Sequence, residues 1–393
     1  MLDFLQYEFN SISIIATIVA ACLLVYQLVY YFVLYGKLLA FYKKKKDKNK
    51  SFENTNNNIQ GVSIVIVTNN NGDALRERLL QVLEQDYPLF EVVVVNENST
   101  DNTEFILFVL KDNYPNLKVI NLEKNANNFE NNKFSLAIGI RSAKYDNVLL
   151  TTVSCEPKGY NWLNRMMKPI NEDYNKKIIT GICLREPANG LANILEQYDL
   201  AISYMNLIPL TLYGNAYTSC GNNMIYNKKF LLNNGGFIAQ YTNNCNQEDF
   251  FVHKFSTKKN TTIVASKDSS LYVPKYPNFK TFLRVKFAES LSKKVLKNKD
   301  KLLLATLPIN AFLFYIAAAF LIFIGFPWQY IVFSCVIKWT IQIIYLKKCS
   351  KRLNIKTAWL FAPLLEFLFF IFNFITRIKV LFFKRKRTKI RWD

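Results

Sequence analysis

The stretch "VSIVIVTNNNGDALRERLLQVLEQDYPLFEVVVVNENSTDNTE", residues 62–104, decides the fold expected for this chain. It holds two short runs rich in valine and isoleucine, at 62–67 and 91–95, separated by a segment whose leucines recur at helical spacing. Short apolar runs of this kind are typical of strands that are buried on both faces of a parallel sheet. Asp-Tyr-Pro at 86–88 ends the helical segment, because the residue before a proline is disfavoured in helical backbone. The stretch therefore predicts a strand, a helix and a second strand.

The same alternation continues along the chain. A helical pattern covers 102–112, and further strands are expected at 117–122 and 147–150. Alternating strands and helices predict an α/β fold, a doubly wound sheet with helices on both faces. Such sheets bind ligands beyond the carboxyl ends of their strands. The segments that matter for function are therefore 68–73, 96–101 and 151–157.

The distribution of charge indicates a membrane protein. The 393 residues are 51% hydrophobic and carry a formal net charge of +21. Half of the lysines and arginines lie in four short stretches that flank apolar runs: 37–50, 293–301, 347–356 and 377–391. This placement follows the positive-inside pattern, and it argues against nucleic acid as a partner, because the basic residues do not decorate the α/β region.

Several apolar runs are long enough to reach across a bilayer. Residues 14–34 predict an uncleaved N-terminal anchor with its start outside and the following domain in the cytoplasm. Residues 302–326 and 328–345 predict a transmembrane hairpin. The last run, 358–375, contains Pro363 and Glu366 and has basic clusters at both ends, so an interfacial or re-entrant helix is favoured over a full crossing.

These features divide the chain into five parts and argue for an integral membrane protein with a cytoplasmic globular domain. The expected parts are an anchor at 1–42, a basic and polar linker at 43–60, the globular domain at 61–290, the hairpin at 291–346 and a basic C-terminal segment at 347–393. Seven cysteines without CxxC spacing and a single histidine make a zinc site improbable and indicate free thiols in a reducing compartment.

Four blocks of sequence carry a family resemblance: 62–104, 133–150, 221–237 and 247–252. Over 61–290 the chain resembles the family 2 glycosyltransferases of nucleotide-diphospho-sugar (GT-A) fold, and in particular the bacterial membrane-anchored subgroup. The resemblance implies a GT-A sheet between N- and C-terminal transmembrane helices. It also implies a nucleotide-sugar donor and a lipid-linked or polysaccharide acceptor.

The resemblance assigns roles to several polar residues. It implies donor binding by Asn96, Glu97, Asp101 and Lys133, although Asp101 also suits the cap of the following helix. Asp249, in the Glu-Asp pair of "NQEDFF", matches the general base that removes the proton from the acceptor hydroxyl. An acidic helix start explains this pair equally well when it is taken alone.

Two features of the family are missing. Its metal-binding aspartate pair falls on Thr152 and Ser154, so the Mg²⁺ or Mn²⁺ expected for the family lacks its ligands and we expect no metal cofactor. Its glutamine and arginine that hold the diphosphate fall on Val285 and Ala288. Arg284 and Lys286 are the candidate substitutes in that stretch, while basic residues beside a bilayer also simply meet lipid headgroups.

Two functions remain open from the sequence. The first is a metal-independent, inverting glycosyltransferase in which Glu97 binds the donor and Asp249 acts as the base. The second is an inactive pseudo-glycosyltransferase that serves as a scaffold or regulatory subunit among other polysaccharide-assembly proteins. The retained Asp249 favours the first, and the missing residues at 152, 154, 285 and 288 favour the second.

Overall fold

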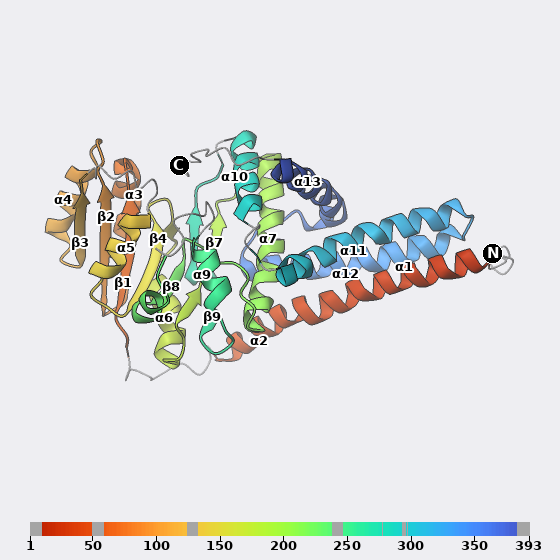
Figure 1. Cartoon of the computed structure of the whole chain (residues 1–393), viewed down its shortest axis with the longest axis horizontal. Helices are drawn as coiled ribbons and strands as arrows, with labels where there is room; N and C mark the ends of the chain where they lie inside the picture. The colour runs from red at the N-terminus through yellow and green to blue at the C-terminus, as the bar shows by residue number, and fades with distance from the viewer. Residues whose placement is uncertain are drawn as a thin grey trace.

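The computed structural model describes residues 10–48, 59–123, 133–237, 247–276, 278–292, 296 and 298–382. Its centre is a seven-stranded sheet with the order β3-β2-β1-β4-β8-β6-β9 (Figure 1). The first four of these strands are parallel, β8 is antiparallel to both of its neighbours, and β9 is parallel to β6. In sheet order the strands span Leu117–Leu122, Phe90–Glu97, Val62–Thr68, Asn147–Thr152, Met224–Asn227, Ile178–Thr180 and Thr261–Ile263.

Strand β1 lies at the centre of the parallel part, as its uninterrupted apolar sequence predicts. It pairs with β2 on one side and with β4 on the other, so that Val62 faces both Phe90 and Asn147. Its side chains alternate between the two faces of the sheet, with Ile64 and Ile66 in one apolar core and Val65 in the other. Because both faces of the strand are buried, its sequence is apolar at successive positions and does not alternate with polar residues.

Helices cover both faces of the sheet, which confirms the predicted α/β fold. One face is packed by α3 (Gly72–Leu83), α4 (Thr103–Asn113) and α6 (Trp162–Glu172). The opposite face is packed by α5 (Lys133–Ser142), α8 (Lys228–Asn233) and α9 (Gln247–Phe255). A smaller sheet places β10 (Ser270–Val273) between β5 (Glu156–Pro157) and β7 (Ile182–Arg185), and a 3₁₀ turn, η5 (Lys267–Ser269), leads into β10.

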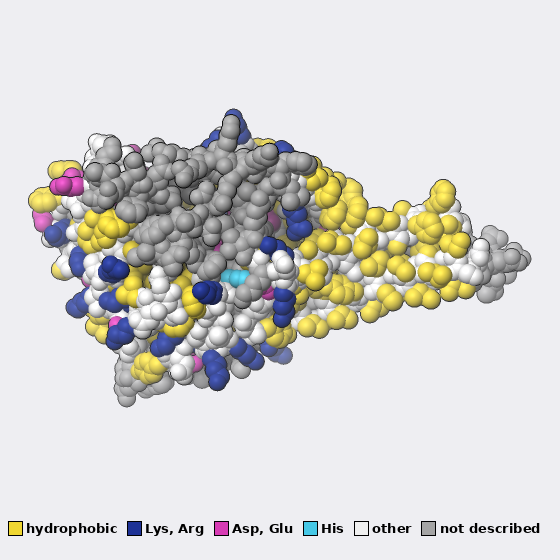
Figure 2. Space-filling model, viewed as in Figure 1, with side chains coloured by type: hydrophobic (Ala, Val, Ile, Leu, Met, Phe, Trp, Pro, Cys, Tyr) yellow, Lys and Arg dark blue, Asp and Glu magenta, His cyan; other side chains and the backbone are white. Residues whose placement is uncertain are grey.

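Four helices of the described chain are long and apolar enough to cross a membrane: Ser11–Lys43, Asn298–Phe323, Trp328–Leu353 and Trp359–Lys379. The first consists of α1 (Ser11–Tyr30), a π-helical turn η2 (Tyr31–Tyr35) and part of α2 (Gly36–Lys48). Together with α11 (Asn298–Phe323) and α12 (Trp328–Leu353) it forms a bundle that extends away from the sheet (Figure 1). Apolar side chains cover the surface of this bundle (Figure 2).

The last apolar helix lies differently. A 3₁₀ turn, η7 (Trp359–Phe361), leads into α13 (Ala362–Phe382), which packs on α10 (Phe279–Ser292) and on α12. In Figure 1 it lies beside α10, at the end of the bundle nearest the sheet. By length and composition it qualifies as a membrane span, so the interfacial or re-entrant position stays a prediction.

A charged pair fastens α13 to the bundle. Lys338 of α12 is 2% exposed, and its Nζ lies 2.7 Å from Glu366 Oε2 of α13 and 2.7 Å from the hydroxyl of Tyr315 in α11. Trp339 donates a further hydrogen bond to Tyr315, at 3.0 Å. Because an isolated charge among apolar helices is costly, each of these two charges requires the other. The ion pair with Lys338 explains why Glu366 occurs within the last apolar stretch of the sequence, 358–375.

Two boundaries differ from those expected. Helix α2 continues to Lys48, so the start of the predicted 43–60 linker is helical, while 49–58 lie outside the described residues. Helix α12 continues past the predicted limit at 346 to Leu353, because Leu346, Cys349 and Leu353 form one buried stripe at helical spacing. Asn354, with φ of 59°, ends the helix in the left-handed conformation.

The globular domain and the bundle share an apolar core. Helix α7 (Leu191–Leu212) supplies Tyr198 and Ile208, and the N-terminal helix supplies Tyr35 and Leu38. A buried polar link supplements this core, because Nε2 of His253 in α9 lies 2.6 Å from Asp300 Oδ2 in α11. Asn215 donates to the other oxygen of the same carboxylate, at 2.8 Å.

We predict that His253→Ala lowers the free energy of unfolding of the detergent-solubilised chain by about 3 kcal/mol, because it removes one partner of a buried pair. Thermal and denaturant unfolding measure the change. The matched control is Lys229→Ala, which removes an ion pair to Asp146 whose side chains are 75% and 53% exposed. That control should cost less than about 1 kcal/mol. Equal losses in the two variants would contradict the role given to His253.

Candidate functional site

The order of the strands defines where a ligand can bind. The chain passes outward from β1 to β2 and β3, and then returns to place β4 on the other side of β1. In open α/β sheets, the reversal between such strands leaves a crevice at their carboxyl ends. The segments after β1, β2 and β4 therefore meet at one edge of the sheet.

The loops after β1 and β2 are tied together by hydrogen bonds. Asp101 Oδ2 accepts from the backbone N–H of Gly72 at 3.1 Å, and its Oδ1 accepts from the N–H of Thr103 at 3.0 Å. Asn70, at φ of 52°, accepts from the N–H of Thr100 at 2.7 Å. Burial raises the pKa of the Asp101 carboxyl, but the hydrogen bonds from Thr103 and Gly72 outweigh it and the pKa is lowered. Asp101 thus positions the loops.

The carboxyl end of β2 carries the two residues expected to bind the donor. Asn96 is 2% exposed, accepts a hydrogen bond from Ser99 at 2.6 Å and donates to Asn121 at 3.2 Å. Its amide is therefore engaged within the protein. Glu97 is half-buried, and burial raises its pKa while a hydrogen bond with Ser135 opposes the shift. A carboxylate whose charge is disfavoured by burial at a strand end is typical of a functional site.

Thr152 and Ser154 lie at the carboxyl end of β4, next to β1. Thr152 Oγ1 is 3.4 Å from Ser154 Oγ and 3.3 Å from Cys155 Sγ. Mg²⁺ and Mn²⁺ prefer carboxylate oxygens, and these two hydroxyls are neutral at ordinary pH. Among the residues that the structure describes, no group of three or more His, Cys, Asp or Glu is arranged to hold a metal ion. The side chains at this position do not fit the family's divalent cation.

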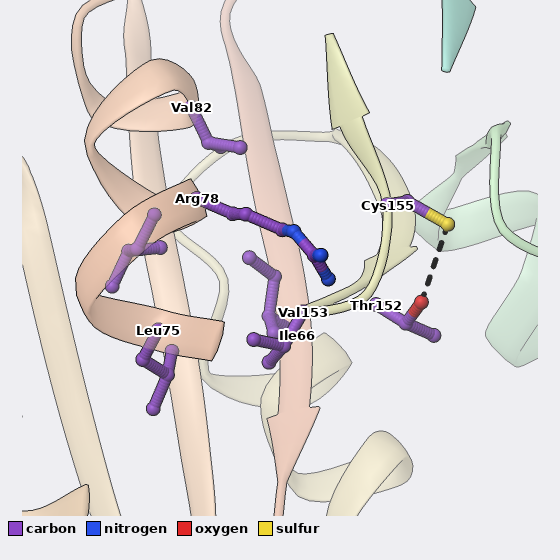
Figure 3. Close-up of a pocket in the computed structure, with 8 residues that line it drawn as sticks. Ile66, Leu75, Arg78, Val82, Thr152, Val153 and Cys155 are labelled. Atoms are coloured by element: carbon purple, nitrogen blue, oxygen red, sulfur yellow. Dashed lines mark hydrogen bonds between the residues drawn. The ribbon is translucent and has the colours of Figure 1, made fainter. Parts of the chain in front are cut away.

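A permanent cation lies beside the same position. Arg78, on α3, donates from its guanidinium to the backbone oxygen of Ser154 at 3.4 Å (Figure 3). Its Nε is 3.6 Å from Glu156, which also pairs with Lys158. Figure 3 shows the Arg78 side chain running from α3 toward Thr152 and Val153, across a small pocket. Arg78 could not be singled out from the sequence, because nothing in its spacing distinguishes it from the other charges of α3.

The candidate base has an unusual set of partners. Asp249 Oδ1 accepts three hydrogen bonds: from the Thr218 hydroxyl at 2.7 Å, from the Ser219 N–H at 2.7 Å and from the Ser219 hydroxyl at 2.9 Å. Within the described part of the chain, Oδ2 has no hydrogen-bond donor. One oxygen thus orients the carboxylate and the other remains available to take a proton. The side chain of Glu248, the other member of the pair, lies outside the described residues.

The two candidate diphosphate contacts lie in different surroundings. Lys286 is 6% exposed, and its Nζ lies 3.0 Å from Glu196, 2.7 Å from Asp199 and 3.1 Å from Glu289. Burial lowers its pKa, but these carboxylates outweigh burial and raise the pKa well above its ordinary value. The charge of Lys286 is therefore balanced by carboxylates, and its ion pairs with Glu196 and Asp199 link α10 to α7. Arg284 is exposed on the same helix.

A continuous set of contacts joins the segments after β4 and before β8. Cys155 interacts with Thr152 and with Asn222. Ser219, three residues before Asn222, binds Asp249. The structure therefore brings Thr152 and Asp249 into one region, with Glu97 two strands away at the same edge. The side chain of Lys133 lies outside the described residues.

Comparison with known proteins bears on this geometry. Residues 63–233 match the family model for glycosyl transferase family 2. These residues belong to glycosyl transferase family 2. No curated protein is similar to the chain.

The mannosyltransferase described next is a solved structure that shares this fold. A mannosyltransferase from Pyrobaculum calidifontis, in complex with GDP-mannose and Mn²⁺, is 15% identical with a TM-score of 0.53; the match covers 93% of this chain and 100% of that one. The TarS protein of S. aureus (1–349) is 17% identical with a TM-score of 0.43, and the match covers 81% of this chain and 90% of TarS. The fold of the chain is thus GT-A, with apolar helices near the N-terminus and in the C-terminal region.

We predict that Glu97→Gln changes how stability depends on pH. A raised pKa in the folded state means that stability is highest below the ordinary pKa of a glutamate and is lost as pH rises through the folded pKa. The variant cannot ionise, so its stability relative to wild type should increase over that window. Unfolding midpoints measured from pH 4 to pH 7.5 check this, with the exposed Glu77→Gln as the control. A constant difference across the range would contradict the assignment.

Proposed function

We propose that this protein transfers a sugar from a nucleotide-sugar donor to a lipid-linked or polysaccharide acceptor, with inversion and without a divalent cation at residues 152–154. The observation that carries the proposal is the geometry of Asp249. Three donors orient its Oδ1, and Oδ2 faces no donor among the described residues. A structural carboxylate would be expected to spread its hydrogen bonds over both oxygens, as Asp101 does.

The chemistry follows from this orientation. Oδ2 of Asp249 removes the proton from the acceptor hydroxyl as that oxygen attacks the anomeric carbon, and the nucleoside diphosphate leaves from the opposite face. Thr218 and Ser219 hold the carboxylate in place throughout, so that little reorganisation accompanies the reaction. Glu97, at the end of β2, accepts hydrogen bonds from the nucleoside part of the donor.

The leaving diphosphate requires positive charge nearby. In our proposal Arg78 supplies it, since its guanidinium lies against the Ser154 backbone oxygen and presents several donors in a plane. Binding of the diphosphate would compete with Glu156 for this side chain, at an ion pair of 3.6 Å. Arg284, exposed on α10, is a second candidate contact.

The position of the domain supports the proposed class of acceptor. The shared core of α7 with the apolar helices holds the α/β domain at the end of the bundle. An acceptor carried on a lipid or growing at the membrane would reach Asp249 without leaving that surface. We place the domain on the cytoplasmic side of a bacterial inner membrane, because the basic clusters flank the apolar helices on that side.

A second function is favoured by a specific observation. Lys286, which stands where a diphosphate contact was expected, is buried among Glu196, Asp199 and Glu289. With Val285 and Ala288 beside it, this part of α10 is built for packing against α7. The alternative is an inactive pseudo-glycosyltransferase that acts as a scaffold or regulatory subunit for other polysaccharide-assembly proteins.

A screen of nucleotide sugars with the membrane-embedded chain tests the proposal, and Asp249→Asn sharpens it. The asparagine oxygen still accepts from Thr218 and Ser219, so donor binding should stay within about twofold. Turnover should fall by about 10²–10⁴-fold, because the base acts only in the transition state. Asp268→Asn, at an exposed ion pair with Arg165, is the matched control and should leave turnover unchanged. Donor binding by wild type with no sugar transfer to any acceptor would favour the scaffold.

A further inference from the structure

Three cysteines from separate segments come together behind the candidate donor site. Cys155 follows β4, Cys183 lies in β7, and Cys220 lies in the loop before β8. The side chain of Cys183 interacts with the thiol of Cys155 on one side and with the thiol of Cys220 on the other. The thiols therefore form a row in which Cys183 is the middle member.

The fold holds this row in place from several directions. The hydroxyl of Tyr204 on α7 accepts from the N–H of Cys183 at 2.8 Å, donates to its carbonyl oxygen at 2.7 Å, and lies 3.6 Å from Cys220 Sγ. Strand β10 pairs with β7 at Cys183 and with β5 two residues after Cys155. Two sheet ladders and one tyrosine thus fix the backbone of Cys183 next to the segments that carry Cys155 and Cys220.

The members of the row differ chemically. Hydrogen bonds with Cys183, Thr152 and Asn222 outweigh burial and lower the pKa of Cys155. The contacts with Cys155 and Cys220, together with burial, raise the pKa of Cys183 well above its ordinary value. The thiolate is the reactive form of cysteine. The lowered pKa of Cys155 supports it as the member of the row that reacts first, with Cys183 as the thiol beside it.

A metal site is a poor explanation of this cluster. No set of three or more His, Cys, Asp or Glu among the described residues converges as metal ligands would. Because Cys183 lies between the other two thiols, the arrangement suits disulfide formation between neighbouring cysteines instead. Cys155 also lines the small pocket beside Arg78 and Thr152 (Figure 3).

We propose that Cys155, Cys183 and Cys220 form an oxidant-sensitive modification site, in which Cys155 is oxidised by a peroxide and then forms a disulfide with Cys183. The Cys155 thiolate attacks one oxygen of hydrogen peroxide, giving a sulfenic acid and releasing hydroxide. The Cys183 thiol then attacks the Cys155 sulfur, and the disulfide forms as water leaves. The two thiols lose two electrons, which reduce the peroxide.

The third thiol, Cys220, allows a second disulfide to form at this site. Cys220 lies next to Cys183, so its thiolate can attack the Cys183 sulfur of the first disulfide. The products are a Cys183–Cys220 disulfide and a free Cys155 thiolate, so the bond moves from the segment of Thr152 to the segment that holds Asp249. This chemistry is independent of whether the protein transfers sugar.

Mass spectrometry of the full chain in detergent micelles, after treatment with hydrogen peroxide, tests the proposal. Wild type should yield peptides that link Cys155 to Cys183, and reduction should remove the link. Cys220→Ser should retain this link. Cys183→Ser should lose it and accumulate Cys155 sulfenic acid, detected by dimedone labelling, at least tenfold above wild type, because the resolving thiol is gone.

Cys349→Ser removes a buried thiol elsewhere, on α12, and should not change the yield of linked peptide. If Cys183→Ser fails to fold, Cys155→Ser keeps the test decisive, since it should abolish the first link and also the Cys183–Cys220 link, which forms only by exchange from the first. Two results would overturn the proposal. One is that Cys155 stays reduced at peroxide levels that oxidise the exposed Cys22; the other is that Cys155 links to Cys220 as readily in Cys183→Ser as to Cys183 in wild type.

Discussion

The parallel pairing of β1 with β2 on one side and β4 on the other is the constraint on which the site depends. Seven residues of β1 are matched in register with β2, and six of them are matched with β4. Because the chain reverses direction across the sheet at β1, three strand ends and their loops meet at one edge. Glu97, Thr152 and the Arg78 helix take their positions from this pairing. A shift in its register would separate them.

Charge is the second constraint. Some charged residues of the family's site are present in this chain, and others are replaced by neutral ones. A departing diphosphate must be neutralised, and in a water-excluded site that need is worth several kcal/mol. In the proposed mechanism the hydroxyls at 152 and 154 are neutral, and Arg78, which reaches the same loop from α3, supplies the positive charge. Lys286 has a different role, since three carboxylates hold it between helices. In the proposed mechanism Asp249, oriented by Thr218 and Ser219, removes the proton.

The sequence predicted the sheet well and the side-chain contacts poorly. The strand at 117–122 and the helix near 102–112 were predicted within one residue, because burial on both faces and helical spacing leave a local pattern. The acids around Lys286 lie up to 90 residues away along the chain, and the three thiols span 65 residues, so no local spacing reveals either group. The extra length of α12 likewise follows from packing against the domain. Asp249 was found by resemblance, whereas the asymmetry of its hydrogen bonds required the structure.

The most direct test of the account is a calorimetric titration of nucleoside diphosphates into the full chain, once with EDTA and once with Mn²⁺. We predict that one nucleotide binds with the same affinity in both buffers, and that a Thr152→Asp, Ser154→Asp double variant gains affinity only when Mn²⁺ is present, since it provides two carboxylate ligands. Wild-type binding that appears with Mn²⁺ and vanishes with EDTA would contradict a metal-free diphosphate site. Absence of binding for every nucleotide in both buffers would contradict the transferase itself.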